Sequence, residues 1–328
     1  MSGVAAATRP KRLAPALAEG IAECMRGDPR VYVWGEDVSI GVMGPTRGLA
    51  DEFGPERVRD CPISESAFVG AAVGAAVGGL RPVVDIMFSS FTYVAFDQLV
   101  NQAGRLRYMT GGQVSLPLVV VGSAGAAGSN AAQHSEVPTA LFLQGGGLRV
   151  VFPSTPHQAF WLMQAAIRSD DPVVVLHHPA LGAARGEVGE TPLALGEAVV
   201  DPAGTDVSVV AVGLMAHRAR AVAKRLSAQG ISVEVVDVCS LSPMPWEQII
   251  ASVAKTGRAV VADEARLTCS VASELAAGIS ERAWSSLKAP VERLAVPDVP
   301  IPFAPSLEAA VIPSEDDIAA AIGRVVDA

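Results

Sequence analysis

The chain has 328 residues, enough for two domains, and half of them are apolar while only 18% are charged. Such an apolar excess favours burial against other subunits. The net charge of −9 argues against a nucleic-acid partner, because such proteins neutralise phosphates with a basic surface. Four cysteines without C-x-x-C spacing indicate neither a zinc site nor a disulfide framework, so we expect reduced thiols in a cytoplasmic protein.

The N-terminal half alternates apolar strands with helices, after a basic segment at residues 1–12 that we expect to be a frayed tail rather than a secretory signal. Helices are expected at residues 13–26, 96–107 and 156–169, and strands at 31–34, 82–87, 116–121, 148–152 and 172–176. This alternation predicts a parallel, doubly wound sheet. Because sites gather at the carboxyl ends of such strands, Glu36 is a candidate pocket residue. A loop acid that caps the next turn explains it equally well.

A Gly/Ala-rich helix follows the short loop that ends in Ser64 and Glu65. Gly70, Gly74 and Gly78 recur every fourth residue and therefore share one helix face. Because glycine costs about 1 kcal/mol relative to alanine in a helix interior, we expect another backbone to approach this face closely. The apolar run is well short of the roughly 20 residues of a membrane span, so a membrane dimerisation motif is excluded. On its own, Glu65 is explained as a first-turn acid that gains from the helix dipole.

Residues 122–132 are rich in Gly, Ala and Ser, a composition that predicts a loop held in place by its neighbours. The loop leads to Gln133, His134 and Ser135. A lone histidine is more often structural than catalytic, although its near-neutral pKa suits acid/base work.

The C-terminal half contains a second α/β unit. We place a linker at residues 186–205, between domains at 1–185 and 206–328. Strands are expected at 207–212, 232–238 and 259–262, and helices at 216–228, 246–255 and 270–284. No G-x-G-x-x-G opens a helix after these strands, which argues against a dinucleotide site. For the charged residues that follow the third strand, Asp263, Glu264 and Arg266, a solvated loop is favoured over a charged interface cluster.

Several separate motifs occur in order along the chain: I-S-E-S-A-F-V-G-A-A-V-G, G-L-R-P-V-V-D-I-M-F, F-D-Q, R-Y-M-T-G-G and A-A-Q-H-S. Together they resemble the beta subunit of the thiamine-diphosphate-dependent decarboxylating component of 2-oxo acid dehydrogenase complexes. The resemblance runs from about Val31 to the C-terminus. It implies two doubly wound, mostly parallel α/β domains, a transketolase-like pyrimidine-binding domain and a transketolase C-terminal-like domain.

The resemblance also implies roles for individual side chains. Glu65 falls on the glutamate that hydrogen-bonds the pyrimidine ring nitrogen and exchanges a proton with it, a task that a carboxyl pKa raised by burial would assist. His134 falls on the histidine that faces the substrate and the incoming lipoyl group. Phe91 falls on the aromatic that packs on the pyrimidine, with Met87 beside it and Glu36 in the same pocket. For Met87 and Phe91, core packing is the open alternative.

Cofactors and partners follow from the same resemblance. An alpha subunit holds the diphosphate through Mg²⁺ in an α₂β₂ heterotetramer, and a lipoyl carrier acyltransferase takes the acyl group. The chain has no G-D-G-type metal motif, so we expect it to be inactive alone. Some relatives hold K⁺ through backbone carbonyls, which would be those of Leu118, Ala166, Ile167, Ser169 and Asp171.

The chain departs from the family in two places. His177 and His178 stand where an acidic and basic segment is usual, and D-E-A-R-L-T-C-S-V-A-S-E-L looks more like acetoin-cleaving relatives. We therefore expect a 2-oxo acid or acetoin dehydrogenase subunit and leave the substrate open. Two alternatives remain: a split thiamine-dependent acyl- or ketol-transferring enzyme of specialised metabolism, and a noncatalytic scaffold with the same fold.

Overall fold

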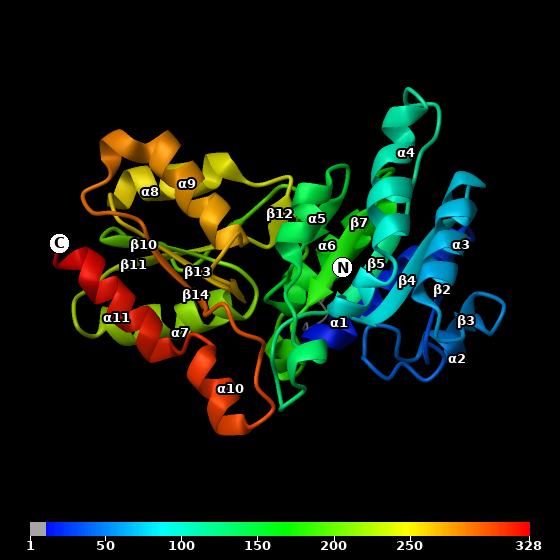
Figure 1. The fold of residues 1–328 in the computed structure, drawn as a ribbon, viewed down its shortest axis with the longest axis horizontal. Coiled ribbons are helices and arrows are strands. Elements are labelled where there is room, and N and C mark those ends of the chain that lie inside the picture. Colours follow the sequence, from blue (N-terminus) through cyan, green and yellow to red (C-terminus); the bar gives the residue numbers. More distant parts are fainter. Residues whose placement is uncertain (1–10) are drawn as a thin grey trace, which may run out of the picture.

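Two parallel-stranded sheets with helices on both faces make up the computed structural model, which describes residues 11–328 (Figure 1). The tail predicted at residues 1–12 thus lies outside the described residues except for its last two. The predicted fold class, two doubly wound and mostly parallel α/β units, is confirmed. Among residues 11–328, no helix is both long and apolar enough to span a membrane.

The first sheet has seven strands in the order β12-β6-β7-β5-β4-β2-β3. They are β2 (Val31–Gly35), β3 (Val58–Asp60), β4 (Arg81–Phe88), β5 (Val119–Ser123), β6 (Arg149–Val151), β7 (Val173–His177) and β12 (Ser240–Ser242). All neighbours are parallel except β12 and β6. The central strands β5 and β7 are valine-rich and buried along their whole length, as expected for strands covered on both faces.

The helices of this unit cover both faces of the sheet. They are α1 (Leu13–Gly27), α2 (Leu49–Phe53), α3 (Glu65–Val77), α4 (Gly104–Met109), α5 (Thr139–Gly145) and α6 (Pro156–Arg168). Because side chains alternate along a strand, Val83 packs in the core with α1 and α6, whereas Val84 packs in the core with α3. Gly20 lets α1 approach α6, since a Cβ there would lie 2.9 Å from the Phe160 carbonyl oxygen.

The second sheet has five strands in the order β14-β13-β10-β11-β9. They are β9 (Val199–Val200), β10 (Val207–Ala211), β11 (Val233–Asp237), β13 (Ala259–Arg266) and β14 (Glu292–Val296). The helices are α7 (Leu214–Ser227), α8 (Trp246–Thr256), α9 (Val271–Ala283), α10 (Pro305–Val311) and α11 (Glu315–Val326). A two-residue ribbon, β1 (Lys11–Arg12) with β8 (Arg185–Gly186), completes the strands of the described chain.

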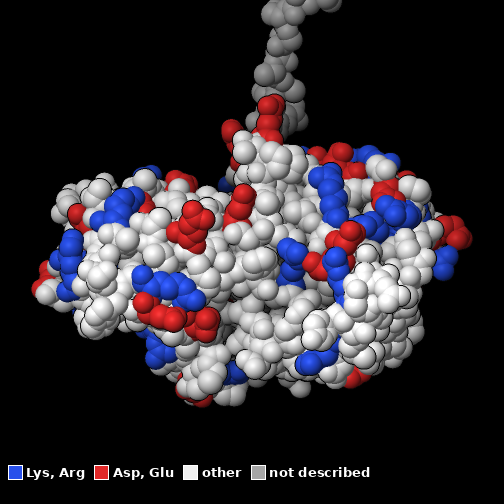
Figure 2. Space-filling model, turned by 90° about the horizontal axis from the view of Figure 1, so that it is seen from above, with Lys and Arg blue, Asp and Glu red and all other residues white. Residues whose placement is uncertain are grey.

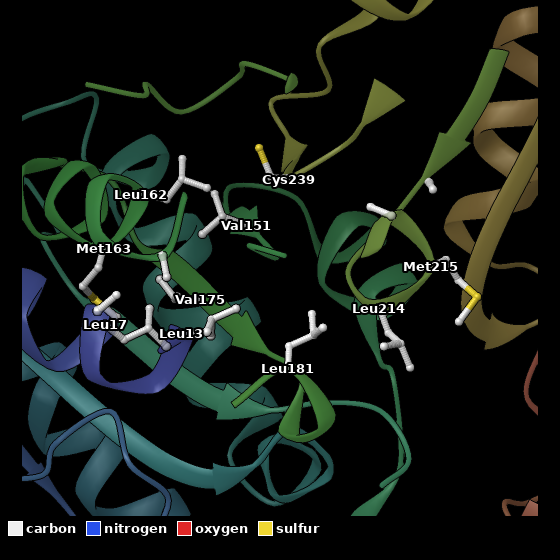
Figure 3. Close-up of a cluster of buried hydrophobic side chains, with 14 of the residues drawn as sticks. Leu13, Leu17, Val151, Leu162, Met163, Val175, Leu181, Leu214, Met215 and Cys239 are labelled. Atoms are coloured by element: carbon white, nitrogen blue, oxygen red, sulfur yellow. The ribbon is translucent and has the colours of Figure 1, made fainter. Parts of the chain in front are cut away.

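The two units share structure across their boundary. Strand β12 from the C-terminal half pairs with β6 of the first sheet, and β9 from the expected linker pairs with β11 of the second. One buried apolar cluster contains Leu13 and Val175 from the first unit as well as Met215 from the second (Figure 3). The boundaries at 1–185, 186–205 and 206–328 stay a prediction.

The solvated loop predicted for Asp263, Glu264 and Arg266 is wrong. Strand β13 continues through all three residues, and Asp263 and Glu264 are only 1% and 6% exposed. Burial raises the pKa of Asp263 to about 6. The strand is longer than predicted because β14, which the sequence analysis did not identify, pairs with it as far as Arg266.

The glycine face of α3 is open rather than covered. Nothing in the described chain lies within 4 Å of a Cβ built at Gly74, and at Gly70 the nearest such atom is the Cγ of Gln98, at 3.4 Å. The expected close backbone approach is therefore not made by this chain itself. The exposed surface is mixed in charge: Figure 2 shows Lys and Arg interspersed with Asp and Glu on one face, without an extended basic patch there.

Candidate active site

Three carboxyl groups come from segments near the carboxyl ends of β2 and β4. Glu36 directly follows β2, Asp85 lies in β4 opposite Gly35, and Glu65 is the first residue of α3. Glu65 is 8% exposed. Burial and the nearby charges of Glu65 and Asp37 raise the pKa of Glu36. The predicted residues Glu36 and Glu65 thus lie close enough for their charges to interact.

Glu36 carries a buried acceptor without a donor. Its Oε1 atom has no hydrogen-bond partner among the described residues. An unsatisfied buried polar atom costs about 1–3 kcal/mol, so a bound group with N–H donors would be stabilised here. An aminopyrimidine provides such donors and also a ring nitrogen that a carboxyl group can protonate. The residues present therefore fit the pyrimidine portion of thiamine diphosphate.

Asp85 supports an unusual backbone conformation at Met87. Its Oδ1 accepts a hydrogen bond from the Met87 N–H at 2.9 Å, and Met87 has a φ of +62°, which is rare for a residue other than glycine. Burial raises the pKa of Asp85 to about 6, although the Met87 N–H opposes the shift. The positive φ at Met87 coincides with a shift in the register between β4 and β5. Strand β4 ends one residue later, at Phe88.

His134 packs against two aromatic side chains. Its ring centroid lies 4.6 Å from that of Phe88 and 5.6 Å from that of Phe91, both in edge-to-face geometry. Phe88 and Phe91 also contact each other, at 5.5 Å. The structure therefore brings the predicted residues Phe91 and His134 together, next to the residue that follows Met87 in the chain. Phe88, which the sequence analysis did not single out, completes the cluster.

Short tethers connect this cluster to α3. The turn η1 (Ser89–Tyr93) follows β4, and Ser66 in the first turn of α3 donates to the carbonyl oxygen of Val94 at 2.7 Å. Ser90 in η1 donates to the carbonyl oxygen of Gln133, the residue before His134. The neighbours of Glu65 and of His134 in the sequence, Ser66 and Gln133, are thus both hydrogen-bonded to the segment from Ser90 to Val94.

The five carbonyls predicted to hold potassium all accept hydrogen bonds within the chain. Arg81 donates from Nε to the Ile167 oxygen at 2.8 Å and from Nη2 to the Ser169 oxygen at 2.6 Å. The carbonyls of Leu118, Ala166 and Asp171 accept from Val173 N, Ser169 N and Ser169 Oγ. A cation would have to share two ligands with a guanidinium group, so the fit for K⁺ is poor. Nor do three His, Cys, Asp or Glu side chains converge as metal ligands anywhere in residues 11–328.

Comparison with known proteins identifies the class of protein to which this chain belongs. The transketolase pyrimidine binding domain matches residues 10–182, and the transketolase C-terminal domain matches residues 196–318. Together with the fold, these matches define a thiamine-diphosphate-dependent enzyme of transketolase-like architecture. A solved structure titled split gene transketolase, inactive beta4 tetramer, has a TM-score of 0.80 and 25% identity, and the match covers 96% of this chain and 98% of that one.

Two curated relatives narrow the assignment. The beta subunit of acetoin:2,6-dichlorophenolindophenol oxidoreductase from Cupriavidus necator is 43% identical, over 95% of this chain and 96% of the relative. The beta subunit of the pyruvate dehydrogenase E1 component from Leifsonia xyli is 42% identical, over 94% and 93%. The chain belongs to the family of beta subunits of acetoin and pyruvate dehydrogenase E1 components.

Sequence reasoning missed Asp85, His178 and Glu264 as residues that organise the site. A lone Asp inside the apolar strand V-V-D-I-M-F was a usable signal, since a carboxyl group in a buried strand needs a partner. For Glu264 no local signal existed, because both of its contacts, His178 and Ala126, are distant in the sequence, with Ala126 at a separation of 138.

Proposed function

We propose that this chain is the beta subunit of a thiamine-diphosphate-dependent dehydrogenase that cleaves acetoin or a 2-oxo acid and passes the acyl group to a lipoyl carrier. The observation that carries the proposal is the placement of Glu65, buried at the head of α3 with Glu36 beside it, while His134 packs on Phe91 in the turn to which α3 is hydrogen-bonded. The acetoin and pyruvate relatives that match almost the whole chain support the same reaction class.

Each of these side chains has a task in the proposed reaction. When bound, thiamine diphosphate supplies a carbon nucleophile and an electron sink for C–C cleavage. Glu65 would hydrogen-bond the pyrimidine ring nitrogen and exchange a proton with it, while Glu36 would add an acceptor to the same pocket. Met87 and Phe91 would pack on the pyrimidine face. His134 would hold or move a proton during acyl transfer.

An alpha subunit would complete the site in an α₂β₂ heterotetramer. Apolar side chains are exposed on both sides of the Glu65 region, with Ile63, Tyr93 and Val94 at 82%, 45% and 59%. Exposed apolar groups of this kind fit burial against a partner. In this assembly the alpha subunit would bind Mg²⁺ and the diphosphate.

Several predictions from the sequence stay open within this proposal. They are the two domain boundaries, the cytoplasmic location, the lipoyl acyltransferase partner and a potassium ion at the five carbonyls. The Arg81 hydrogen bonds weigh against the potassium ion.

Reconstitution with an alpha-type partner tests the function. The two chains are co-expressed, supplied with thiamine diphosphate and Mg²⁺, and assayed for reduction of 2,6-dichlorophenolindophenol with acetoin, pyruvate or 2-oxoisovalerate. We expect reduction with one of these substrates and only when both chains are present. Transfer of an acyl or ketol group to an aldehyde acceptor without dye reduction would instead support the alternative of a split acyl- or ketol-transferring enzyme. Cofactor binding without any turnover would support a noncatalytic scaffold.

A further inference from the structure

A strand of the second unit reaches into the loop that carries His134. Glu264 belongs to β13, yet its Oε1 accepts a hydrogen bond from the backbone N–H of Ala126 at 2.6 Å. Its Oε2 lies 2.8 Å from Nε2 of His178, which follows β7 in the first unit. Both side chains are buried, His178 at 0% and Glu264 at 4% side-chain exposure. A carboxyl group of one unit is therefore enclosed between a histidine and a loop of the other.

The orientation of the His178 ring follows from its second nitrogen. Nδ1 accepts a hydrogen bond from the Ala180 N–H at 3.1 Å, so it carries no proton. The ring proton is therefore on Nε2, the nitrogen beside Glu264. That contact is close but does not meet hydrogen-bond geometry, so it acts through the attraction between the N–H dipole and the carboxyl group.

The loop backbone is pressed directly onto this pair. A Cβ built at Gly125 would lie 2.3 Å from Nε2 of His178 and 3.0 Å from Oε1 of Glu264, and Gly125 has a φ of +98°. Only glycine fits such a close approach with a positive φ. The pair thus determines where the loop leaves β5.

The same strand also holds the far end of the loop. Arg266 lies two residues after Glu264, at the end of β13. It donates two hydrogen bonds to Glu136, at 2.6 and 2.8 Å, and Glu136 is two residues beyond His134. Such bidentate charge-assisted pairs are geometrically specific. Strand β13 therefore grips the loop at Ala126 and at Glu136, with His134 between the two contacts.

We propose that the buried His178–Glu264 pair is a positioning device through which the second unit holds the His134 loop in its working position. Its catalytic consequence rests on the proposed function, because it acts through His134. Glu264 and His178 themselves touch neither substrate nor cofactor in this proposal. Loss of the pair should let the loop open while the sheets remain folded.

Three substitutions separate the contributions of the pair. Glu264→Gln keeps an oxygen that can accept from Ala126 but removes the charge that faces His178. His178→Asn keeps an acceptor for the Ala180 N–H and removes Nε2. Arg266→Lys weakens the contact of Arg266 with Glu136 at the far end of the loop. Because the Arg266 side chain is partly exposed, this substitution tests how β13 holds the loop without changing the core.

The matched control is Glu234→Gln. Glu234 is 1% exposed in the same sheet, pairs with Lys255 and accepts from the Gly204 N–H at 3.0 Å. It resembles Glu264 in burial and in its backbone contact, but it does not touch the loop. Its substitution therefore reports the general cost of altering a buried carboxylate in this unit.

Hydrogen exchange measured by mass spectrometry on the full chain gives a readout independent of activity. For Glu264→Gln and His178→Asn we expect amides in residues 124–136 to exchange about tenfold faster or more, as for the loss of an interaction with a charged group. Amides of β5 should stay protected. Glu234→Gln should leave the loop unchanged, and Arg266→Lys should affect only its far end. In the reconstituted enzyme, kcat for acyl transfer should fall while KM for the dehydrogenase substrate and cofactor affinity change little.

Wild-type exchange in residues 124–136 for both core variants would overturn the proposal. If one core variant fails to fold, wild-type exchange in these residues of the other core variant overturns it instead. Loop opening with unchanged kcat would refute the catalytic role of the grip. If the wild-type complex turns over none of the substrates, the proposed function fails, yet the exchange measurement still decides whether the pair holds the loop.

Discussion

His134 stands edge-on to Phe88, with ring centroids 4.6 Å apart and ring planes at 82°. Edge-to-face contacts of this kind contribute about 0.5–1.5 kcal/mol beyond area burial, so they orient the imidazole without using its nitrogens. Packing therefore fixes the orientation of the His134 ring, and in the proposed reaction its two nitrogens are left to transfer protons.

Replacement of His134 by alanine should separate two steps of the proposed reaction. We expect thiamine diphosphate to bind as in the wild type and acyl transfer to slow by about 10²–10⁴, the usual contribution of a general acid or base. The measurement compares decarboxylation with an artificial acceptor against transfer to lipoamide in the assembled complex. Unchanged rates in both assays would leave His134 with a structural role only.

The substitution Glu65→Gln tests the proposed proton donor. It keeps the size and one hydrogen bond but cannot exchange a proton, so the cofactor should bind while deuterium exchange at its thiazolium carbon becomes slow. If Glu65 served only as a first-turn acid, the change would cost at most about 1 kcal/mol of stability and leave the exchange rate unaltered. Wild-type exchange in this variant would therefore refute the role.

Asp85→Asn should change how stability depends on pH. The folded-state pKa of Asp85 is about 6, against an ordinary value of 3.8. As pH rises between these values the unfolded chain releases this proton first, so the group lowers wild-type stability with rising pH. Asparagine keeps the acceptor for the Met87 N–H and does not titrate.

The stability of Asp85→Asn relative to the wild type should therefore increase between pH 4 and pH 6 and then level off. A shift of two pKa units corresponds to about 3 kcal/mol. Urea unfolding of both proteins at pH 4, 5, 6 and 7 measures the difference. A constant difference across this range would mean that Asp85 ionises normally in the folded protein.

The open glycine face of α3 predicts an interface. Gly74 is exposed and nothing lies within 4 Å of a Cβ built there, so Gly74→Leu should leave the isolated chain folded but weaken self-association and assembly with the alpha subunit. Sedimentation of the co-expressed pair measures the effect. Gly323→Leu is the control, because Gly323 also lies in a helix with open space around it. Normal assembly of Gly74→Leu would show that this face is not buried by a partner.

Potassium should not stabilise the chain specifically. Arg81 already donates to the carbonyls of Ile167 and Ser169, two of the five predicted ligands. The melting temperature should therefore be equal in KCl and NaCl at the same ionic strength. An ion present at 100 times its Kd would add about 2.7 kcal/mol to the free energy of unfolding. A clear rise of the melting temperature in KCl alone would therefore support a potassium site.

Much of the fold could be predicted from local sequence patterns. Valine-rich runs and helical spacing placed β2, β4, β5, β7 and the main helices within a few residues, because each reports how one segment buries its own side chains. Glu65 stood out for the same reason, as a single acid at the head of an apolar helix. The resemblance to a known family then assigned chemistry to Glu65 and His134.

Only the tertiary structure decided how distant segments meet. Glu264 is buried beside His178 and the Ala126 N–H of the first unit, and a sequence separation of 138 between Ala126 and Glu264 leaves no local pattern that records their hydrogen bond. The assignment of β12 to the first sheet and the open face at Gly74 were likewise undetermined, because edge pairing and surface cover depend on what packs nearby in space. Side-chain periodicity reports which face of an element is buried, whereas the identity of the covering residue is settled only when the whole chain folds.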